Sequence, residues 1–448
     1  MSSQSPSFPP QRVHKLADYE SIVGAEVLED LRTFAENISG KTVIHVNSTR
    51  AGGGVAEILF RLVPLMREIG LNAKWEIIKG DAQFFESTKA FHNSLQTGAR
   101  LATKESFDHF IRKTEENLRE MSLDGDTMFI HDPQPIGLIA KRKSNAKQVW
   151  IWRCHIDVSN PEREVWNFLA KYVNQYDATV FSTPSFARSD LKIPQFMVSP
   201  SIDPLSDKNR PLPETFIDRV LSKYELDSEK PLITQISRFD YAKDPIGVIQ
   251  AFKLVSDHID CQLVLAGSLA DDDPEGMEVY SKVVKAAEGR KDIHILLIPP
   301  FSDLEINALQ RASTIILQKS IKEGFGLTVA ESLWKAKPVI AGATGGIPLQ
   351  VKNGLTGFLV HNIEGAAYRM RYLLRNPDIA ARMGLNGREH VRQNFLITRH
   401  LGEYLLMILS LENHAKGERF SNRFEEKEEE EAAAAAQTHT VIPQTHPK

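Results

Sequence analysis

The sequence has 448 residues, of which 42% are hydrophobic and 25% are charged, with a formal net charge of −4. This composition is typical of a globular protein of roughly two to four domains, and it lacks the clustered basic face that duplex nucleic acid requires. No apolar run approaches about 18 residues, and the first residues form no secretion signal, so we expect no membrane span. Cys154 and Cys261 stand in apolar stretches, which predicts buried free thiols in a cytosolic protein.

Strand-like and helix-like segments alternate along the chain. In the first half, the predicted strands are Val43–Val46, Lys74–Ile78, Met128–His131, Val149–Arg153 and Ala178–Ser182. In the second half, they are Leu232–Ile236, Gln262–Ala266, Ile293–Leu297, Thr314–Gln318, Val339–Ala341 and Gly357–Val360. Helical periodicity lies between strands, as in Val55–Ile69 and Glu164–Tyr172. The alternation predicts an α/β fold with parallel sheets covered by helices, arranged as two Rossmann-like, doubly wound domains that face each other across a cleft.

The composition also marks the limits of these domains. A polar, proline-containing stretch from Asp203 to Pro213 divides the halves, which predicts one domain over residues 12–212 and a second over 213–393. Residues 1–11 are rich in Ser and Pro, and residues 417–448 contain an acidic block followed by five alanines. Both ends are predicted to be disordered because nothing in them buries an apolar face. A solvated tail is the default for the C-terminal end, with a partner-binding segment as the alternative.

The segment Glu323-Gly-Phe-Gly-Leu-Thr-Val-Ala-Glu331 carries two carboxylates at the end of a predicted strand. It is typical of a strand, a tight loop and a helix start. Gly324 and Gly326 let the backbone approach a ligand, and the free N–H groups of the helix can hold anionic oxygens. Glu331, about two turns into the helix, can reach a polyol on the same side. Phosphate at the helix tip and hydroxyls beside it indicate a nucleotide sugar.

Two further motifs stand at predicted strand ends. Ser237-Arg-Phe-Asp-Tyr-Ala-Lys243 follows the strand Leu232–Ile236, and Ala51-Gly-Gly-Gly54 follows the strand Val43–Val46. Ligands of open α/β sheets bind outside the carboxyl ends of the strands. The three motifs therefore predict one shared site.

These residues resemble the donor site of retaining family-4 glycosyltransferases, which have the GT-B fold. Further motifs are similar to the trehalose synthase branch, which joins a nucleotide-activated glucose to free glucose: His45-Val-Asn-Ser-Thr49, Thr88-Lys-Ala-Phe-His-Asn93, His131-Asp-Pro-Gln-Pro135, Trp150-Ile-Trp-Arg-Cys-His-Ile-Asp157 and Asp272-Asp-Pro-Glu-Gly276. The resemblance covers about residues 12–410. It implies a last helix, about 394–416, that returns to the first domain, and it implies a homodimer. Trehalose phosphorylases are similar to the same branch and are the alternative.

The resemblance assigns donor-site roles. Arg238 and Lys243 would clamp the diphosphate without a metal, because fixed cations can neutralise the leaving group; a surface ion pair of Arg238 with Asp240 is the competing interpretation. Glu331 would hold the ribose, and Glu323 would hold sugar hydroxyls near the anomeric carbon. The backbone amides of the donor loop would bind sugar and phosphate; these are the amides of Gly324, Phe325, Gly326 and Leu327. Gly53 and Gly54 would approach the diphosphate from the facing domain.

The predicted acceptor residues follow strands of the first half. Asp132 is the candidate for holding the acceptor glucose, and His155 would contribute a carbonyl or ring nitrogen near the reacting sugar. Asp157, His92 and Asn93 complete the acceptor set, although packing roles are the alternative for the histidines and Asn93. The family implies retention of the α configuration by front-face attack, with a phosphate oxygen taking the acceptor proton. No residue is nominated as a covalent nucleophile.

Other chemistries stay open. Asp271-Asp-Asp273 could suggest a divalent metal, but consecutive aspartates do not by themselves supply convergent octahedral ligands, so we expect a solvated loop or helix cap, no metal and no cofactor. The alternatives to a trehalose synthase are a phosphorylase, a transferase with another small acceptor, and a sugar-nucleotide sensor without turnover.

Overall fold

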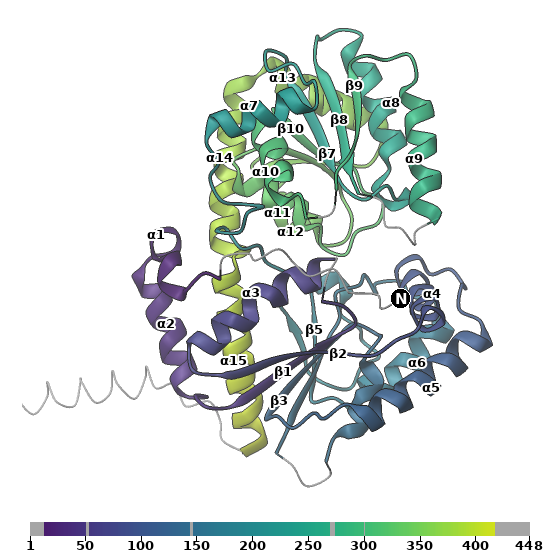
Figure 1. The fold of residues 1–448 in the computed structure, drawn as a ribbon, viewed down its shortest axis with the longest axis vertical. Helices are drawn as coiled ribbons and strands as arrows, with labels where there is room; N and C mark the ends of the chain where they lie inside the picture. Colours follow the sequence, from purple (N-terminus) through teal and green to yellow (C-terminus); the bar gives the residue numbers. More distant parts are fainter. Residues whose placement is uncertain (1–12, 51–52, 144–146, 269–273, 300, 417–448) are drawn as a thin grey trace, which may run out of the picture.

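Two parallel sheets form the framework of the protein, one above the other in Figure 1. The structure is a computed structural model that describes residues 13–50, 53–143, 147–268, 274–299 and 301–416. The predicted disordered ends therefore lie outside the described residues. The two helix-covered parallel sheets confirm the predicted α/β architecture.

Each sheet contains six parallel strands. The first has the order β2–β1–β3–β4–β5–β6, with β1 (Thr42–Asn47), β2 (Asn72–Ile77), β3 (Thr127–His131), β4 (Val149–Arg153), β5 (Ala178–Phe181) and β6 (Gln195–Met197). The second has the order β12–β11–β10–β7–β8–β9, with β7 (Leu232–Ile236), β8 (Gln262–Gly267), β9 (Ile293–Leu297), β10 (Ile315–Gln318), β11 (Val339–Gly342) and β12 (Gly357–Val360). Strand β6 was not predicted, because it is short and only half-buried.

Alternating side chains cover the two faces of the first sheet. Val43, Phe129 and Ile151 pack on one face, whereas Ile44, Met128 and Trp150 pack on the other. The first face is covered by α2 (Ala25–Glu36), α3 (Gly54–Glu68) and α15 (Ile397–Lys416), and the second by α4 (Ala82–Thr97), α5 (Lys104–Glu120) and α6 (Arg163–Val173). This alternation follows from the two-residue period of a strand.

Helices cover both faces of the second sheet as well. One face packs against α8 (Pro245–Ser256), α9 (Pro274–Ala287) and α13 (Ile363–Arg375). The other packs against α7 (Glu214–Lys223), α10 (Asp303–Ala312), α11 (Leu327–Trp334), α12 (Ile347–Gln350) and α14 (Pro377–Asn394). The remaining α-helix, α1 (Glu20–Val23), precedes α2 and touches α14.

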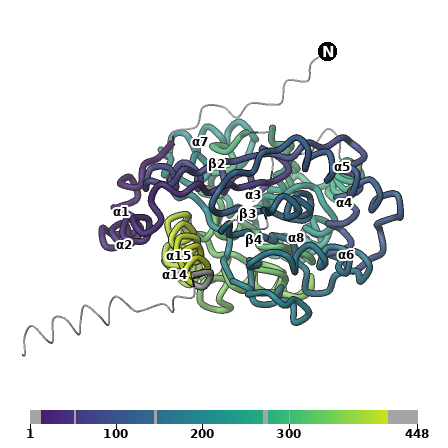
Figure 2. The backbone as a smooth tube through the Cα atoms, turned by 90° about the horizontal axis from the view of Figure 1, so that it is seen from below, coloured from purple at the N-terminus to yellow at the C-terminus, as the bar shows by residue number. Residues whose placement is uncertain are grey.

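The chain passes between the two sheets at two places that lie side by side. The first follows β6, and the second joins α14 to α15. There, Ile202 N–H donates to the carbonyl of Phe395 at 2.9 Å, and Ile397 N–H donates to the carbonyl of Ile202 at 3.0 Å. Helix α15 then packs against α2 and α3, beside the first sheet (Figure 2). The domain limits at residues 212/213 and 393/394 stay predictions.

No helix in the described part of the chain is long and apolar enough to cross a membrane. Both cysteines are free and buried, as predicted.

Candidate functional site

The loop between β10 and α11 places Glu323 beside Lys243, which belongs to the motif that follows β7. Lys243 Nζ lies 2.6 Å from Glu323 Oε2, and both side chains are largely buried. The hydroxyl of Ser320 also donates to Glu323 Oε2, at 3.2 Å. A cation and a carboxylate that are far apart in the sequence thus meet at the carboxyl ends of β7 and β10.

The glycines of this loop allow its close approach to the first domain. Gly326 has a φ of 82° and directly precedes α11, a conformation that favours glycine. A Cβ atom at Gly324 would lie 2.8 Å from the carbonyl oxygen of His155. The side chain of Phe325 packs inward, with its ring centroid 5.6 Å from that of Phe395. Only the backbone of Phe325 is therefore left for the predicted contact with the donor.

Arg238 is the most exposed member of the predicted clamp. Its side chain is 65% exposed, and its Nη2 lies 3.2 Å from Asp240 Oδ2, so the surface ion pair considered from the sequence is formed. On the facing domain, burial lowers the pKa of His92, on which the charges of Arg238 and Asp240 also act. Helix α4, which carries His92 and the half-buried Asn93, therefore faces Arg238.

Glu331 lies deeper, in a polar network that no sequence motif indicated. Its carboxylate accepts from Gln310 Nε2 at 3.3 Å and lies 3.8 Å from Lys208 Nζ. Lys208 also pairs with Glu57 of α3, at 2.7 Å. Burial raises the pKa of Glu331, while the nearby ammonium of Lys208 opposes that rise. A lysine of the interdomain linker thus joins α3 to the proposed ribose carboxylate.

Burial alone would lower the pKa of Lys208, yet Glu57, Glu331 and Asp303 raise it overall. The lysine is therefore a permanent cation between the two domains. Sequence reasoning missed it, because a lysine in a polar linker resembles any solvated charge.

The N-termini of two helices meet between the domains. Gly53 has a φ of 82° and precedes α3, and a Cβ atom at Gly54 would lie 2.9 Å from Leu327 Cδ1 at the start of α11. Ala51 and Gly52 lie outside the described residues. Helix N-termini carry partial positive charge and free N–H groups, so this junction suits an anion.

A cavity of about 160 Å³ opens at the carboxyl ends of β1 and β3. Polar groups and glycines predominate in its lining, which consists of Asn47, Ser48, Thr49, Gly53, Gly54, Val55, His131 and Asp132. Asp132 has a φ of 64°, and its Oδ1 accepts from the backbone N–H of His155 at 2.7 Å. Burial raises the pKa of Asp132 to about 6. The predicted acceptor carboxylate thus lies in a cavity beside the donor loop.

Three histidines form a hydrogen-bonded row beside this cavity, and the middle one, His131, belongs to its lining. His45 Nδ1 lies 3.1 Å from His131 Nε2, and His131 Nδ1 lies 3.0 Å from His155 Nε2. They come from β1, from β3 and from the residue pair after β4, which are neighbours in the sheet. Only His155 was predicted as a site residue.

Asp157 is buried away from this lining. Its Oδ1 accepts from both the backbone N–H and the hydroxyl of Ser159, at 2.9 and 2.6 Å. These contacts form a local turn, and the proposed acceptor role of Asp157 has no direct contact in its favour.

Among the described residues, no group of three or more His, Cys, Asp or Glu side chains is arranged to hold a metal. Asp271–Asp273 lie outside those residues.

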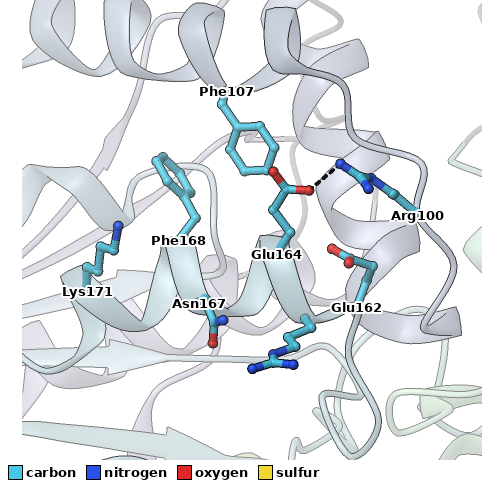
Figure 3. Close-up of a pocket in the computed structure, with 8 residues that line it drawn as sticks. Arg100, Phe107, Glu162, Glu164, Asn167, Phe168 and Lys171 are labelled. Atoms are coloured by element: carbon cyan, nitrogen blue, oxygen red, sulfur yellow. Dashed lines mark ion pairs between the residues drawn. The ribbon is translucent and has the colours of Figure 1, made fainter.

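A larger cavity, of about 540 Å³, lies elsewhere, beside α5 and α6 (Figure 3). Its charged residues include Arg100 and Glu164, which pair at 2.7 Å and remain largely exposed. Phe107 and Phe168 form its apolar wall (Figure 3). None of the predicted site residues lines this cavity.

Family comparisons agree with this geometry. Residues 45–188 match the family model described as trehalose synthase, N-terminal domain, and residues 217–390 match glycosyl transferases group 1. The chain is 44% identical over 402 residues to a trehalose synthase of Pyrococcus horikoshii, covering 89% of this chain and 96% of that protein. The chain belongs to the trehalose synthase family. As a member of that family, it is a glycosyltransferase.

Relatives and solved structures extend this assignment. A trehalose phosphorylase of Grifola frondosa is 30% identical over 441 residues, covering 85% of this chain and 59% of that protein. A sucrose-phosphate synthase from Thermosynechococcus elongatus superposes with a TM-score of 0.65 at 15% identity, covering 83% of this chain and 99% of that one. The trehalose synthase family member described here thus has the GT-B fold predicted from its sequence.

Proposed function

We propose that the protein makes trehalose by transferring glucose from a nucleoside-diphosphate glucose to free glucose, with retention of the α configuration. Membership of the trehalose synthase family supports this activity. The observation that carries the proposal is the approach of Gly324 to the His155 carbonyl, because it joins the donor loop to the acceptor cavity.

On the donor side, cations would receive the charge that develops on the departing diphosphate. Lys243 supplies a point charge in a largely buried position, and Arg238 is exposed and free to reorient toward phosphate. The N-termini of α3 and α11 add backbone N–H donors. Electrostatic stabilisation aimed at developing charge is usually the largest catalytic contribution. The clamp thus requires no metal in this proposal.

Glu331 would bind the ribose hydroxyls, and Glu323 would hold sugar hydroxyls and stabilise the cationic ring. The ammonium of Lys243 lies 2.6 Å from this carboxylate, beside the proposed reacting centre. Glu323 therefore acts in the proposal as an electrostatic group, and no covalent intermediate is invoked. The acceptor hydroxyl attacks from the same face as the leaving group and transfers its proton to a phosphate oxygen.

On the acceptor side, Asp132 would bind glucose in the cavity, with His155 beside the reacting sugar. His92 and Asn93 would contribute from α4. The polar lining suits an uncharged polyol, because hydroxyls exchange hydrogen bonds with carboxylate, amide and hydroxyl groups.

Product analysis tests the proposal. The purified protein is incubated with glucose and ADP-, UDP- or GDP-glucose in the presence of a chelator, and a second sample receives trehalose and inorganic phosphate. Trehalose and a nucleoside diphosphate in the first sample are the expected result. Glucose 1-phosphate from the second sample alone would make the protein a phosphorylase and would overturn the ribose role of Glu331.

The same assay addresses the remaining candidates. Transfer to another small acceptor, with none to glucose, would redirect the acceptor assignment. Binding of nucleotide sugar without transfer to any acceptor would indicate a sensor.

The proposed setting is the cytoplasm, and the proposed assembly is a homodimer. The two free, buried cysteines are compatible with a reducing compartment. Light scattering of the purified protein would give its mass, and a monomer would contradict the proposed dimer.

A further inference from the structure

The row of histidines beside the acceptor cavity has a defined order of contacts. It begins at Met66 of α3, whose Sδ lies 3.4 Å from His45 Nε2. It continues through His45 and His131 to His155, and each link joins two ring nitrogens. His45 and His131 are fully buried, whereas His155 is partly exposed.

The three rings are neutral. Burial lowers the pKa of His45 to about 3, and burial also lowers the pKa of His131 and of His155 well below their usual range. The guanidinium of Arg153, which is fully buried beneath them, acts in the same direction on the pKa of His131 and His155. A neutral imidazole has one donor nitrogen and one acceptor nitrogen. Each link therefore needs one protonated and one bare nitrogen.

Met66 sets the direction of the row. A thioether sulfur can accept a hydrogen bond weakly but has no proton to donate, so His45 Nε2 carries the proton. His45 Nδ1 is then bare and accepts from His131 Nε2–H. By the same reasoning, His131 Nδ1 is bare and accepts from His155 Nε2–H. The proton positions of all three rings follow from this one contact.

We propose that this row makes His155 Nδ1 a bare hydrogen-bond acceptor for a sugar hydroxyl at the transfer site. Nδ1 has no hydrogen-bond partner in the described residues, and the ring belongs to the residue whose carbonyl meets the donor loop. Met66 and His45 are positioning residues, because they act on the sugar only through His131 and His155. The inference rests on the proposed transfer of glucose.

Nitrogen-15 NMR of the full chain with labelled histidine tests the tautomer without any substrate. We expect the proton of His155 on Nε2, with the signal assigned from the loss of a resonance in His155→Asn. A His155 ring protonated on Nδ1 would overturn the proposal, whatever reaction the protein catalyses. This measurement therefore separates failure of the tautomer from failure of the proposed function.

Fluorinated and deoxygenated glucoses test the role of the bare nitrogen. Fluorine accepts but cannot donate, so at one hydroxyl the fluoro sugar should lose about fivefold in kcat/KM, as much as the deoxy sugar, because a neutral hydrogen bond contributes about 1 kcal/mol. Both the donor glucosyl group and the acceptor are scanned. The opposite result would be a fluoro sugar that keeps its kcat/KM at every position where the deoxy sugar loses it. That result would mean that His155 donates, contrary to the proposal.

Met66→Leu removes the sulfur while keeping a similar apolar side chain, and His45→Phe removes the next link. In both variants the loss of kcat/KM caused by fluorine at the hydroxyl that donates to His155 should fall to about twofold. The losses at the other sugar positions should be the same as in the wild type. His109→Gln is the matched control, because His109 is a buried histidine that pairs with Asp81, the N-cap residue of α4, outside the row. An unchanged penalty in Met66→Leu and in His45→Phe would refute the positioning role.

Discussion

The two sheets carry opposite kinds of electrostatic groups at the candidate site. The side belonging to the second sheet is charged, with the Lys243–Glu323 pair, Arg238 and the buried Glu331. The side belonging to the first sheet has a row of uncharged histidines, and burial raises the pKa of its aspartate, Asp132, to about 6. A diphosphate needs fixed charge, whereas a free sugar needs oriented hydrogen bonds. The difference thus parallels the chemistry of the two proposed substrates.

Removing the charge of Lys243 is the strongest way to break this comparison. Lys243→Met should lower kcat/KM for the nucleotide sugar by at least about 100-fold, because one donor aimed at developing charge contributes about 3 kcal/mol or more. Steady-state kinetics measure this effect. Lys253→Met, which removes a lysine of α8 that donates to the carbonyl of Ala286, is the control and should lose little activity.

The double variant Lys243→Met/Glu323→Gln separates catalysis from packing. It removes both partners of the largely buried pair, so it should be more stable than Lys243→Met alone, in which Glu323 has lost its counterion. Its activity should stay low. Recovery of activity together with stability would mean that the pair is structural. The charge of the second sheet would then not be explained by catalysis.

Glu331→Gln should affect binding of the nucleotide more than the chemical step. Loss of hydrogen bonds from ribose hydroxyls to a charged group costs about 1.5–3 kcal/mol, which corresponds to a rise of about 10- to 100-fold in KM for the nucleotide sugar. Unchanged affinity in a direct calorimetric titration with nucleoside diphosphate would remove Glu331 from the ribose site.

The substitution Asp132→Asn tests how the acceptor side treats charge, because its effect on stability should depend on pH. The pKa of Asp132 is about 6 in the folded protein and about 4 in an unfolded chain, so the folded state favours the protonated form. Wild-type stability contributed by this group is present below about pH 4 and is lost as pH rises through 6. The variant should therefore exceed wild type by about 1–3 kcal/mol above pH 6 and match it near pH 4.

Thermal unfolding of Asp132→Asn and wild type between pH 4 and 8 gives this difference. A variant that is less stable than wild type at pH 7 would show that the folded state favours the ionised carboxylate, contrary to the raised pKa of Asp132.

Two glycine substitutions at the junction have the smallest expected effects. The Cβ of Gly324→Ala would meet a backbone carbonyl at 2.8 Å, whereas that of Gly54→Ala would meet the terminal methyl of Leu327 at 2.9 Å. Backbone yields less easily than a side-chain end, so kcat/KM should fall about tenfold in the first variant, equivalent to about 1.4 kcal/mol, and about twofold in the second. Equal losses would mean that the two contacts are equally rigid.

The sequence predicted most of the strands and the charged motifs at their carboxyl ends, but not the contacts between those motifs. Strands β4, β7, β9 and β12 have the predicted bounds. For β4, β7 and β12 the reason is that largely apolar runs between turn residues define buried parallel strands. Strand β6 was missed, because three half-exposed residues carry no such signal. The row of histidines could not be predicted, because the sequence does not state that β1, β3 and β4 are neighbours. Lys208 gave no signal, because its role depends on two partners in different domains.

The paired crossings at Ile202 and Leu396 have a mechanical consequence. Two backbone segments that cross side by side confine the connection between the sheets to a few residues, and a few such residues can absorb the torsion-angle changes of a hinge rotation. Displacement grows with distance from such a pin. A small rotation there would separate the facing helix tips at Gly54 and Leu327 while leaving α15 seated on α2 and α3, so admission of substrate and release of product need not disturb either core.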